Sequence, residues 1–369
     1  MKNKTDFTID DSRMTQGVAI VCMIMGHLYW YKGTNVPGTP LIWITRDRSL
    51  VFYLAFLCDI TVPLYCFVSG YGLYYRFTRC KMQVGLYYRK SLRKILNLLV
   101  RFQVVCILYF LLGMLFDPSL SPSWYAARFP GSCLLLENYA NGAWWYVATY
   151  ISFILISPLF LLLLKKDSGL ETLRTGILWF ALYLYVCHFR FDVRHLTSRP
   201  APWESGYWKA LLLRRSTDLW FVGSCILIGM GLAKLRLVER LRKRWYAWNI
   251  RPVRNSILIV LLLLLSIFLC VKEDAILVYF SAPLFFILLN LMEKNKILSR
   301  ILLFLGKHSI NIWLFHMAFY LHVFEGLVYK AEYPVLVLLF MFALSIGTSY
   351  LINWLMRPVY RILTKIMLP

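Results

Sequence analysis

Long apolar stretches separated by short polar segments run along the whole of this chain. A helix of about 20 residues rises about 30 Å, which is the thickness of the hydrocarbon layer of a membrane. Apolar stretches of that length are therefore predicted to be membrane-spanning helices. The pattern predicts an all-α polytopic membrane protein with about ten such helices, at approximately 14–31, 50–75, 95–116, 143–164, 172–190, 217–234, 254–271, 275–292, 308–328 and 334–356.

Composition supports the same class. Of the 369 residues, 60% are hydrophobic and 16% are charged, which is too apolar for a soluble globular chain. The net charge of +23 would suit a protein that binds nucleic acid, but the Lys and Arg residues cluster in short segments between the apolar stretches. Orientation in a membrane explains that distribution, so the lipid bilayer is the expected partner and nucleic acid is not.

The distribution of basic residues also predicts the orientation of the chain. An even number of spans places both termini on one side, and that side carries more than twice as many Lys and Arg residues as the other. Because cytoplasmic loops are enriched in these residues, both termini are predicted to be cytoplasmic. The first apolar stretch lacks the features of a cleaved signal peptide, so it is expected to remain as a helix of the cell membrane.

No internal repeat or low-complexity linker interrupts the pattern. Residues 1–369 are expected to form a single transmembrane domain without a separate soluble domain, so any chemistry falls to the helices and their loops. Nine cysteines are scattered, mostly within apolar stretches, without CxxC or Cys/His metal spacing. They are interpreted as small membrane hydrophobes, and no metal is expected. The oligomeric state is left open.

His27 is the leading candidate for chemistry. It lies about 20 Å along the first predicted helix from Arg13, and so well inside the hydrocarbon layer. A polar side chain at that depth is expected to face a cavity or another polar group. Imidazole titrates near neutrality, so His27 could take a proton from an acceptor hydroxyl or carry an acyl group transiently. The alternative is a histidine that only hydrogen-bonds a neighbouring helix.

Two further ionisable groups lie within predicted spans. Asp59 is about 13 Å from the outer side of the second span, which is the antiparallel neighbour of the first. It could reach His27, fix its tautomer and stabilise the imidazolium; alternatively, it lines a wet outer mouth. His316 lies about 12 Å beyond His308 along the ninth span and is a second buried titratable group.

A cluster of basic residues precedes the third span. Lys90 and Arg93 share one face of the helix that enters this span, and Arg89 is one turn from Arg93. Guanidinium forks suit phosphate and pyrophosphate, which would place a phosphorylated cytoplasmic donor here. The alternative is anchoring against anionic lipid.

Three other features are weaker candidates. Ser69 lies beside Gly70 in a tract that predicts a kinked, closely packed helix, and it lacks the Gly-x-Ser-x-Gly elbow of a serine nucleophile. Trp144 begins the fourth span at the outer surface, where an aromatic belt is the default interpretation. The longest outer connection, residues 190–217, is rich in aromatic and basic residues and could line a mouth that faces carbohydrate.

Taken together, five tracts of the chain resemble the acyltransferase 3 family of membrane O-acyltransferases. They occur in the family's order over nearly the whole chain, at 16–27, 62–71, 90–93, 144–159 and 305–316. The resemblance implies transfer of an acyl group from a cytoplasmic acyl-CoA, most simply acetyl-CoA, to a hydroxyl outside the cytoplasm. The acceptor would be a surface polysaccharide or a lipid-linked glycan.

The family's first-span motif is a basic residue, ten intervening positions and a histidine. His27 matches the histidine, while Gln16 stands at the basic position and Arg13, one helical turn earlier, is the candidate substitute. The family's Arg-x-x-Arg appears as Lys90-x-x-Arg93, which keeps the charge but loses one guanidinium fork.

Two other functions are compatible with the pattern. A transporter or flippase of a lipid-linked sugar would use the buried histidines and Asp59 as a proton or substrate path, although the chain shows no two-fold repeat. A glycan polymerase would use the outer loop 190–217. Consumption of acyl-CoA would identify the transferase, and a changed glycan length would identify the polymerase.

Overall fold

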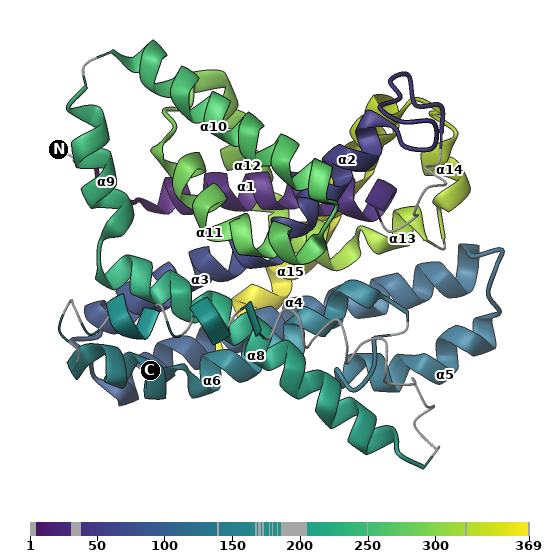
Figure 1. Ribbon diagram of the computed structural model, residues 1–369. Helices are drawn as coiled ribbons and strands as arrows, with labels where there is room; N and C mark the ends of the chain where they lie inside the picture. The colour runs from purple at the N-terminus through teal and green to yellow at the C-terminus, as the bar shows by residue number, and fades with distance from the viewer. Residues whose placement is uncertain are drawn as a thin grey trace. The chain divides into compact units, whose positions relative to one another are not determined.

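The computed structural model is built of helices (Figure 1). It describes residues 5–30, 38–138, 140–166, 205–248, 250–321 and 323–367, and, between these, 168, 171, 173–176, 178, 180–182 and 184–185. The larger helices are α1 (Ile9–Met25), α2 (Leu50–Leu57), α3 (Thr61–Arg79), α4 (Val84–Phe116), α5 (Pro122–Cys133), α6 (Trp145–Lys166), α8 (Tyr207–Lys234), α9 (Leu237–Tyr246), α10 (Arg251–Lys272), α11 (Ala275–Leu291), α12 (Lys296–Phe315) and α15 (Pro334–Met367). The short helices are α13 (Met317–Tyr320) and α14 (Glu325–Tyr329).

Seven helical segments among the described residues are long and apolar enough to cross a membrane. Each contains or overlaps a predicted span, so the chain is an all-helical, multi-pass membrane protein. The segments are Leu50–Arg79, Val84–Phe116, Gly142–Lys165, Tyr207–Lys234, Arg251–Lys272, Lys296–Phe315 and Pro334–Arg361. The count of ten spans and the cytoplasmic termini remain predictions, and about half of the predicted span 172–190 lies outside the described residues.

One predicted span is wrong in its continuity, and another contains an irregular turn. The second span is confirmed as one helical segment, Leu50–Arg79, with a 3₁₀ turn at Cys58–Ile60 between α2 and α3. The predicted span 308–328 is not one helix, because α12 begins at Lys296 and ends at Phe315, before α13 and α14. The early start has a local cause: the side chain of Asn295 accepts a hydrogen bond from the amide of Leu298 at 2.8 Å and caps the helix.

The chain forms two compact units. The first comprises residues 1–19, 59–88 and 149–303, and the second comprises residues 20–58, 89–148 and 304–369.

In the first unit, α3 and α8 cross closely where two glycines meet the opposite backbone. A Cβ atom at Gly70 would lie 2.2 Å from the carbonyl oxygen of Ile226, and one at Gly229 would lie 2.3 Å from that of Phe67. Small residues at helix crossings in membranes let the backbones approach and pack. The close packing predicted for the tract around Gly70 is therefore confirmed.

Replacing Gly70 by alanine is expected to destabilise the protein by about 1–3 kcal/mol, because the new methyl group overlaps the backbone of α8. The measurement is thermal unfolding of the purified protein in detergent. Gly72→Ala is the matched control, since a Cβ atom there meets nothing within 4 Å. Equal melting temperatures for the two variants would contradict the close crossing.

A buried ion pair joins the start of α1 to α9 in the same unit. Arg242 donates to both carboxylate oxygens of Asp11, at 2.7 and 3.2 Å, and to the carbonyl oxygen of Asn290 at 2.8 Å. The two side chains are 5% and 11% exposed. Burial alone would raise the pKa of Asp11, but hydrogen bonds and charge from Arg242, with hydrogen bonds from Thr8, hold that pKa below its usual value. The pair fixes α1 against α9.

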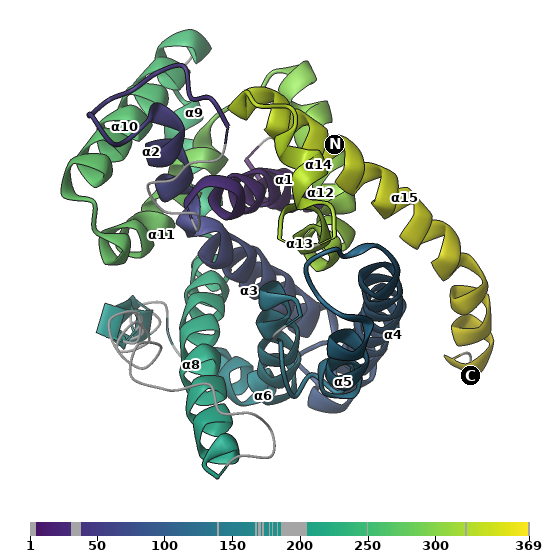
Figure 2. The same ribbon diagram turned by 90° about the vertical axis from the view of Figure 1, so that its right-hand side faces the viewer.

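In the second unit, α5 lies alongside the second half of α4 (Figures 1 and 2). The ring of Tyr125 fills the space beside Gly113, and the amide of Gln103 donates to the carbonyl oxygen of Cys133 at 2.8 Å. The contacts therefore run from near the end of α4 back towards its middle. The connection between the third and fourth predicted spans thus folds back along α4 instead of staying at its end.

Candidate functional site

His27 lies in an irregular turn at the end of the first helix. Residues Gly26–Trp30 form a single π-helical turn that continues α1. Such turns are rare, and many of those that occur lie at functional sites. The extra residue in the turn changes the direction in which side chains leave the helix. Gly26 is buried against α2, where a Cβ atom would lie 3.8 Å from the carbonyl oxygen of Ala55.

His316 lies at a second irregularity, the break between α12 and α13. The break leaves two carbonyl groups in the last turn of α12, those of Trp313 and Leu314, to be satisfied by side chains. The carbonyl oxygen of Trp313 lies 2.8 Å from Nδ1 of His316. The carbonyl oxygen of Leu314 accepts from the amide of Asn141 at 3.1 Å and from the indole of Trp144 at 2.8 Å.

The structure brings these two histidines together, although 288 residues separate them along the chain. Nδ1 of His27 lies 2.6 Å from Nε2 of His316, which is a short hydrogen bond. The ring planes differ by 5° and the ring centroids are 4.9 Å apart. Because the nitrogens are so much closer than the centroids, the parallel rings meet edge to edge, with an N–H of one directed at the lone pair of the other.

The two rings differ in exposure. His316 is 0% exposed, whereas His27 is half-buried and keeps some accessible surface. The ring of Tyr320 lies nearly parallel to both, with its centroid 5.7 Å from that of His27 and 5.9 Å from that of His316. His27 is therefore the member of the pair that keeps accessible surface, and His316 is enclosed by protein.

Trp144 does not belong to an aromatic belt at the surface. Its side chain is 1% exposed and packs edge-on against Phe102 and Tyr109 of α4, with ring centroids 5.1 and 5.2 Å apart. These residues lie about 10–20 Å along the helix from the end of α4 at Phe116. The surface interpretation of Trp144 is wrong because the chain before it folds back along α4, and its indole instead satisfies the broken end of α12.

Arg101 is a charged residue of this unit that the sequence analysis did not name as a candidate, although it lies within the third predicted span. Its guanidinium donates to the side chains of Asn311 on α12, Asn353 on α15 at 3.1 Å and Tyr360 on α15 at 2.6 Å. Asn311 in turn donates to Ser349 Oγ at 2.9 Å. An arginine within an apolar stretch was the available signal, because such a charge needs polar partners.

The helices that hold Arg101 carry no acidic residue. The sequences of α4, α12 and α15 contain neither Asp nor Glu. Neutral amide and hydroxyl oxygens therefore supply the partners that the structure gives to this guanidinium. The result is a positive region in the second unit.

The predicted donor site also lies on α4. Arg89, Lys90 and Arg93 all occur in its first three turns and are exposed. They are accessible to an anionic ligand, and their role in donor binding stays a prediction.

The remaining predicted residues belong to the first unit. Arg13 is exposed, with its guanidinium 4.0 Å from the carboxylate of Asp10. Gln16 is half-buried in α1, and its carbonyl oxygen accepts from the hydroxyl of Tyr65 at 3.4 Å. Ser69 is half-buried in α3, and Asp59 is half-buried in the 3₁₀ turn before α3. The pairing of Asp59 with His27 stays a prediction.

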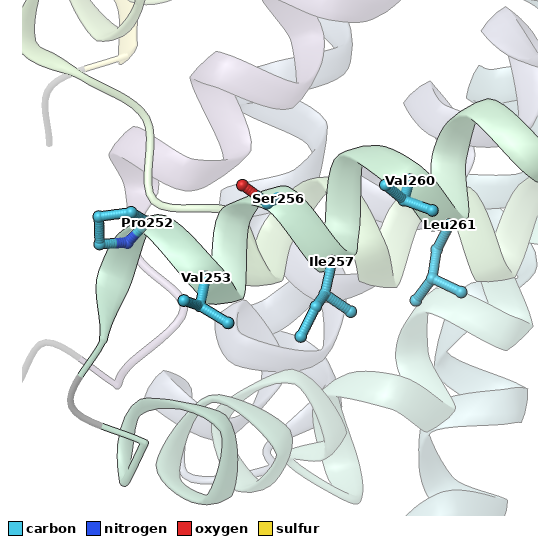
Figure 3. A pocket seen from close by; sticks show the side chains of 6 residues that line it. All are labelled: Pro252, Val253, Ser256, Ile257, Val260 and Leu261. Carbon is cyan, nitrogen blue, oxygen red and sulfur yellow. The ribbon is translucent and has the colours of Figure 1, made fainter.

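Two other parts of the chain offer candidate surfaces. In the outer loop 190–217, residues 190–204 lie outside the described residues, which resume at Ser205. A hollow on α10 is lined by residues of that helix alone, and nearly all are apolar (Figure 3): Pro252, Val253, Ser256, Ile257, Val260 and Leu261. Such a surface suits contact with lipid tails, and it lacks the convergent polar groups of a ligand site.

No group of three His, Cys, Asp or Glu side chains suited to hold a metal ion occurs among the described residues.

Comparison with known proteins identifies the family of the chain. The family model described as an acyltransferase domain, that of acyltransferase 3, matches residues 13–354. No curated protein and no solved structure matches the chain.

Proposed function

Since the chain belongs to the acyltransferase 3 family and is a multi-pass membrane acyltransferase, we propose that it is an O-acetyltransferase. Its donor is cytoplasmic acetyl-CoA, and its acceptor is a hydroxyl of an extracytoplasmic polysaccharide or lipid-linked glycan. It acts in the cell membrane. The resemblance of the His27 and Lys90–Arg93 tracts to the family motifs supports these finer assignments.

The observation that carries the proposal is the contact between a half-buried His27 and a fully buried His316, in which Nδ1 of His27 lies 2.6 Å from Nε2 of His316. In this reaction His27 takes the proton of the acceptor hydroxyl as its oxygen attacks the thioester carbonyl carbon. The carbon–sulfur bond then breaks, and the proton passes from His27 to the departing thiolate. The products are the acetyl ester and CoA. A positioned base of this kind typically contributes 10²–10⁴-fold to the rate.

The donor is placed at the start of α4. CoA carries phosphate groups, and the exposed side chains of Arg89, Lys90 and Arg93 offer positive charge and hydrogen-bond donors for them. The lack of acidic residues on α4, α12 and α15 supports the same assignment, since no carboxylate of these helices repels an anionic ligand. Asp59 is proposed to orient His27 or to line the path of the acceptor.

The test is a donor assay with the purified protein in lipid vesicles. Acetyl-CoA and the surface glycan of the producing cell are supplied. Free CoA is measured with a thiol reagent, and the mass of the glycan is measured by mass spectrometry. We expect glycan-dependent release of CoA and a gain of one acetyl mass per CoA released.

The same assay separates the alternative functions. A flippase of lipid-linked sugar would move the glycan lipid without releasing CoA, and a polymerase would change the length of the glycan without adding acetyl groups. Either outcome, with the protein intact, would overturn the transferase assignment.

A further inference from the structure

We propose that His316 is a positioning residue that sets the tautomer of His27. Nε2 of His27 is then the atom that accepts the proton of the incoming hydroxyl. The inference rests on the proposed function. It follows from the donor and acceptor roles in two consecutive hydrogen bonds, one between Trp313 and His316 and one between His316 and His27.

The first step assigns the tautomer of His316. Its Nδ1 lies 2.8 Å from the carbonyl oxygen of Trp313. A carbonyl oxygen can only accept a hydrogen bond, so Nδ1 of His316 carries a hydrogen. In the neutral imidazole the other nitrogen, Nε2, then carries a lone pair.

The second step assigns the tautomer of His27. The lone pair on Nε2 of His316 faces Nδ1 of His27 at 2.6 Å, with the two rings parallel and edge to edge. Two lone pairs at that distance would repel each other, so Nδ1 of His27 must donate a hydrogen. Nε2 of neutral His27 is therefore the unprotonated nitrogen, which is the form that a general base needs.

The break in α12 makes this assignment a property of the fold. The helix ends at Phe315, so the carbonyl of Trp313 is available to the side chain of His316. The neighbouring carbonyl of Leu314 is occupied by Asn141 and Trp144, which hold the broken end in place. The direction of both hydrogen bonds is thus set by a backbone group that cannot change its role.

The arrangement also has a place for the positive charge that forms during the reaction. When His27 accepts a proton at Nε2, its Nδ1–H remains directed at the lone pair of His316. The hydrogen bond strengthens because its donor is now cationic. His316 itself is 0% exposed, so it supports the charge without meeting the substrate.

The experiment compares two replacements of similar size. His316→Gln keeps an acceptor oxygen for Nδ1 of His27, whereas His316→Leu removes it. We expect His316→Leu to lower kcat by about 10²-fold or more with a change in donor KM of less than about two-fold, and His316→Gln to recover at least about a tenth of the wild-type kcat. A residue that only fills space would give the same kcat in both variants, and that result would overturn the proposal.

A second measurement does not depend on activity or on the folding of the His316 variants. Solid-state ¹⁵N spectra of histidine-labelled protein distinguish protonated from unprotonated ring nitrogens, and the difference between wild type and His27→Ala isolates His27. We expect a protonated Nδ1 and an unprotonated Nε2; the reverse pattern would overturn the proposal. If His27→Ala is inactive but His316→Leu matches wild type, this inference fails alone, whereas an active His27→Ala would remove the proposed function.

Discussion

Replacing His27 by alanine is expected to lower acetyl transfer to the glycan by about 10²- to 10⁴-fold, because the reaction loses the base that takes the proton of the acceptor hydroxyl. The pair geometry makes the effect specific to this ring, since His316 is fully buried and cannot replace it. The measurement is the acetyl content of surface glycan in cells that express the variant, together with CoA release by the purified protein.

His308→Gln is the matched control for this variant. His308 is also buried, but its Nδ1 lies 2.8 Å from the hydroxyl of Ser349, and a glutamine can keep a hydrogen bond there. We expect this control to stay within about three-fold of wild type, well short of the loss that removal of a general base causes. Undiminished acetyl content with His27→Ala at normal protein levels would exclude His27 from the mechanism.

Replacing Asp11 by asparagine is expected to lower the free energy of unfolding by about 3–5 kcal/mol, because it leaves the charge of Arg242 buried without its carboxylate. Arg242 is 5% exposed at its side chain, and its two hydrogen bonds to Asp11 are 2.7 and 3.2 Å long. The measurement is thermal unfolding in detergent, followed by the fluorescence of the tryptophans.

The adjacent residue supplies the control for this prediction. Asp10 is paired with Arg13 at 4.0 Å, with side chains 52% and 56% exposed, so Asp10→Asn is expected to change stability by less than about 1 kcal/mol. The two substitutions change the net charge equally, and any difference between them comes from burial. Similar melting temperatures for both variants would contradict the role given to the Asp11–Arg242 pair.

The helical spans were predictable because the membrane imposes their pattern. A segment in hydrocarbon must satisfy its own backbone groups and present apolar side chains, so length and hydropathy suffice to place it. The prediction failed where a helix stops inside an apolar run. Around His316 the neighbouring residues are apolar or aromatic, and the carbonyl group of Leu314 at the broken end accepts from Asn141 and Trp144, far away along the chain.

The candidate site was predictable in part for a different reason. His27 and His316 could be named because a titratable group within an apolar stretch is costly and needs a partner. Their partnership was not predicted, since the sequence pattern offered Asp59, on the neighbouring span, as the group that could reach His27. Trp144 was placed wrongly because hydropathy does not show that the segment before it folds back along α4.

The sequence by itself determined that this protein is a helical membrane protein, that it is a member of the acyltransferase 3 family and that His27 is the residue to test first. Only the tertiary structure decided which group lies against His27 and which nitrogen of its ring bears the proton. Hydropathy depends on each residue alone, whereas a tautomer depends on the direction of hydrogen bonds between groups that folding brings together. Here that direction starts at the carbonyl of Trp313 and reaches His27 through His316.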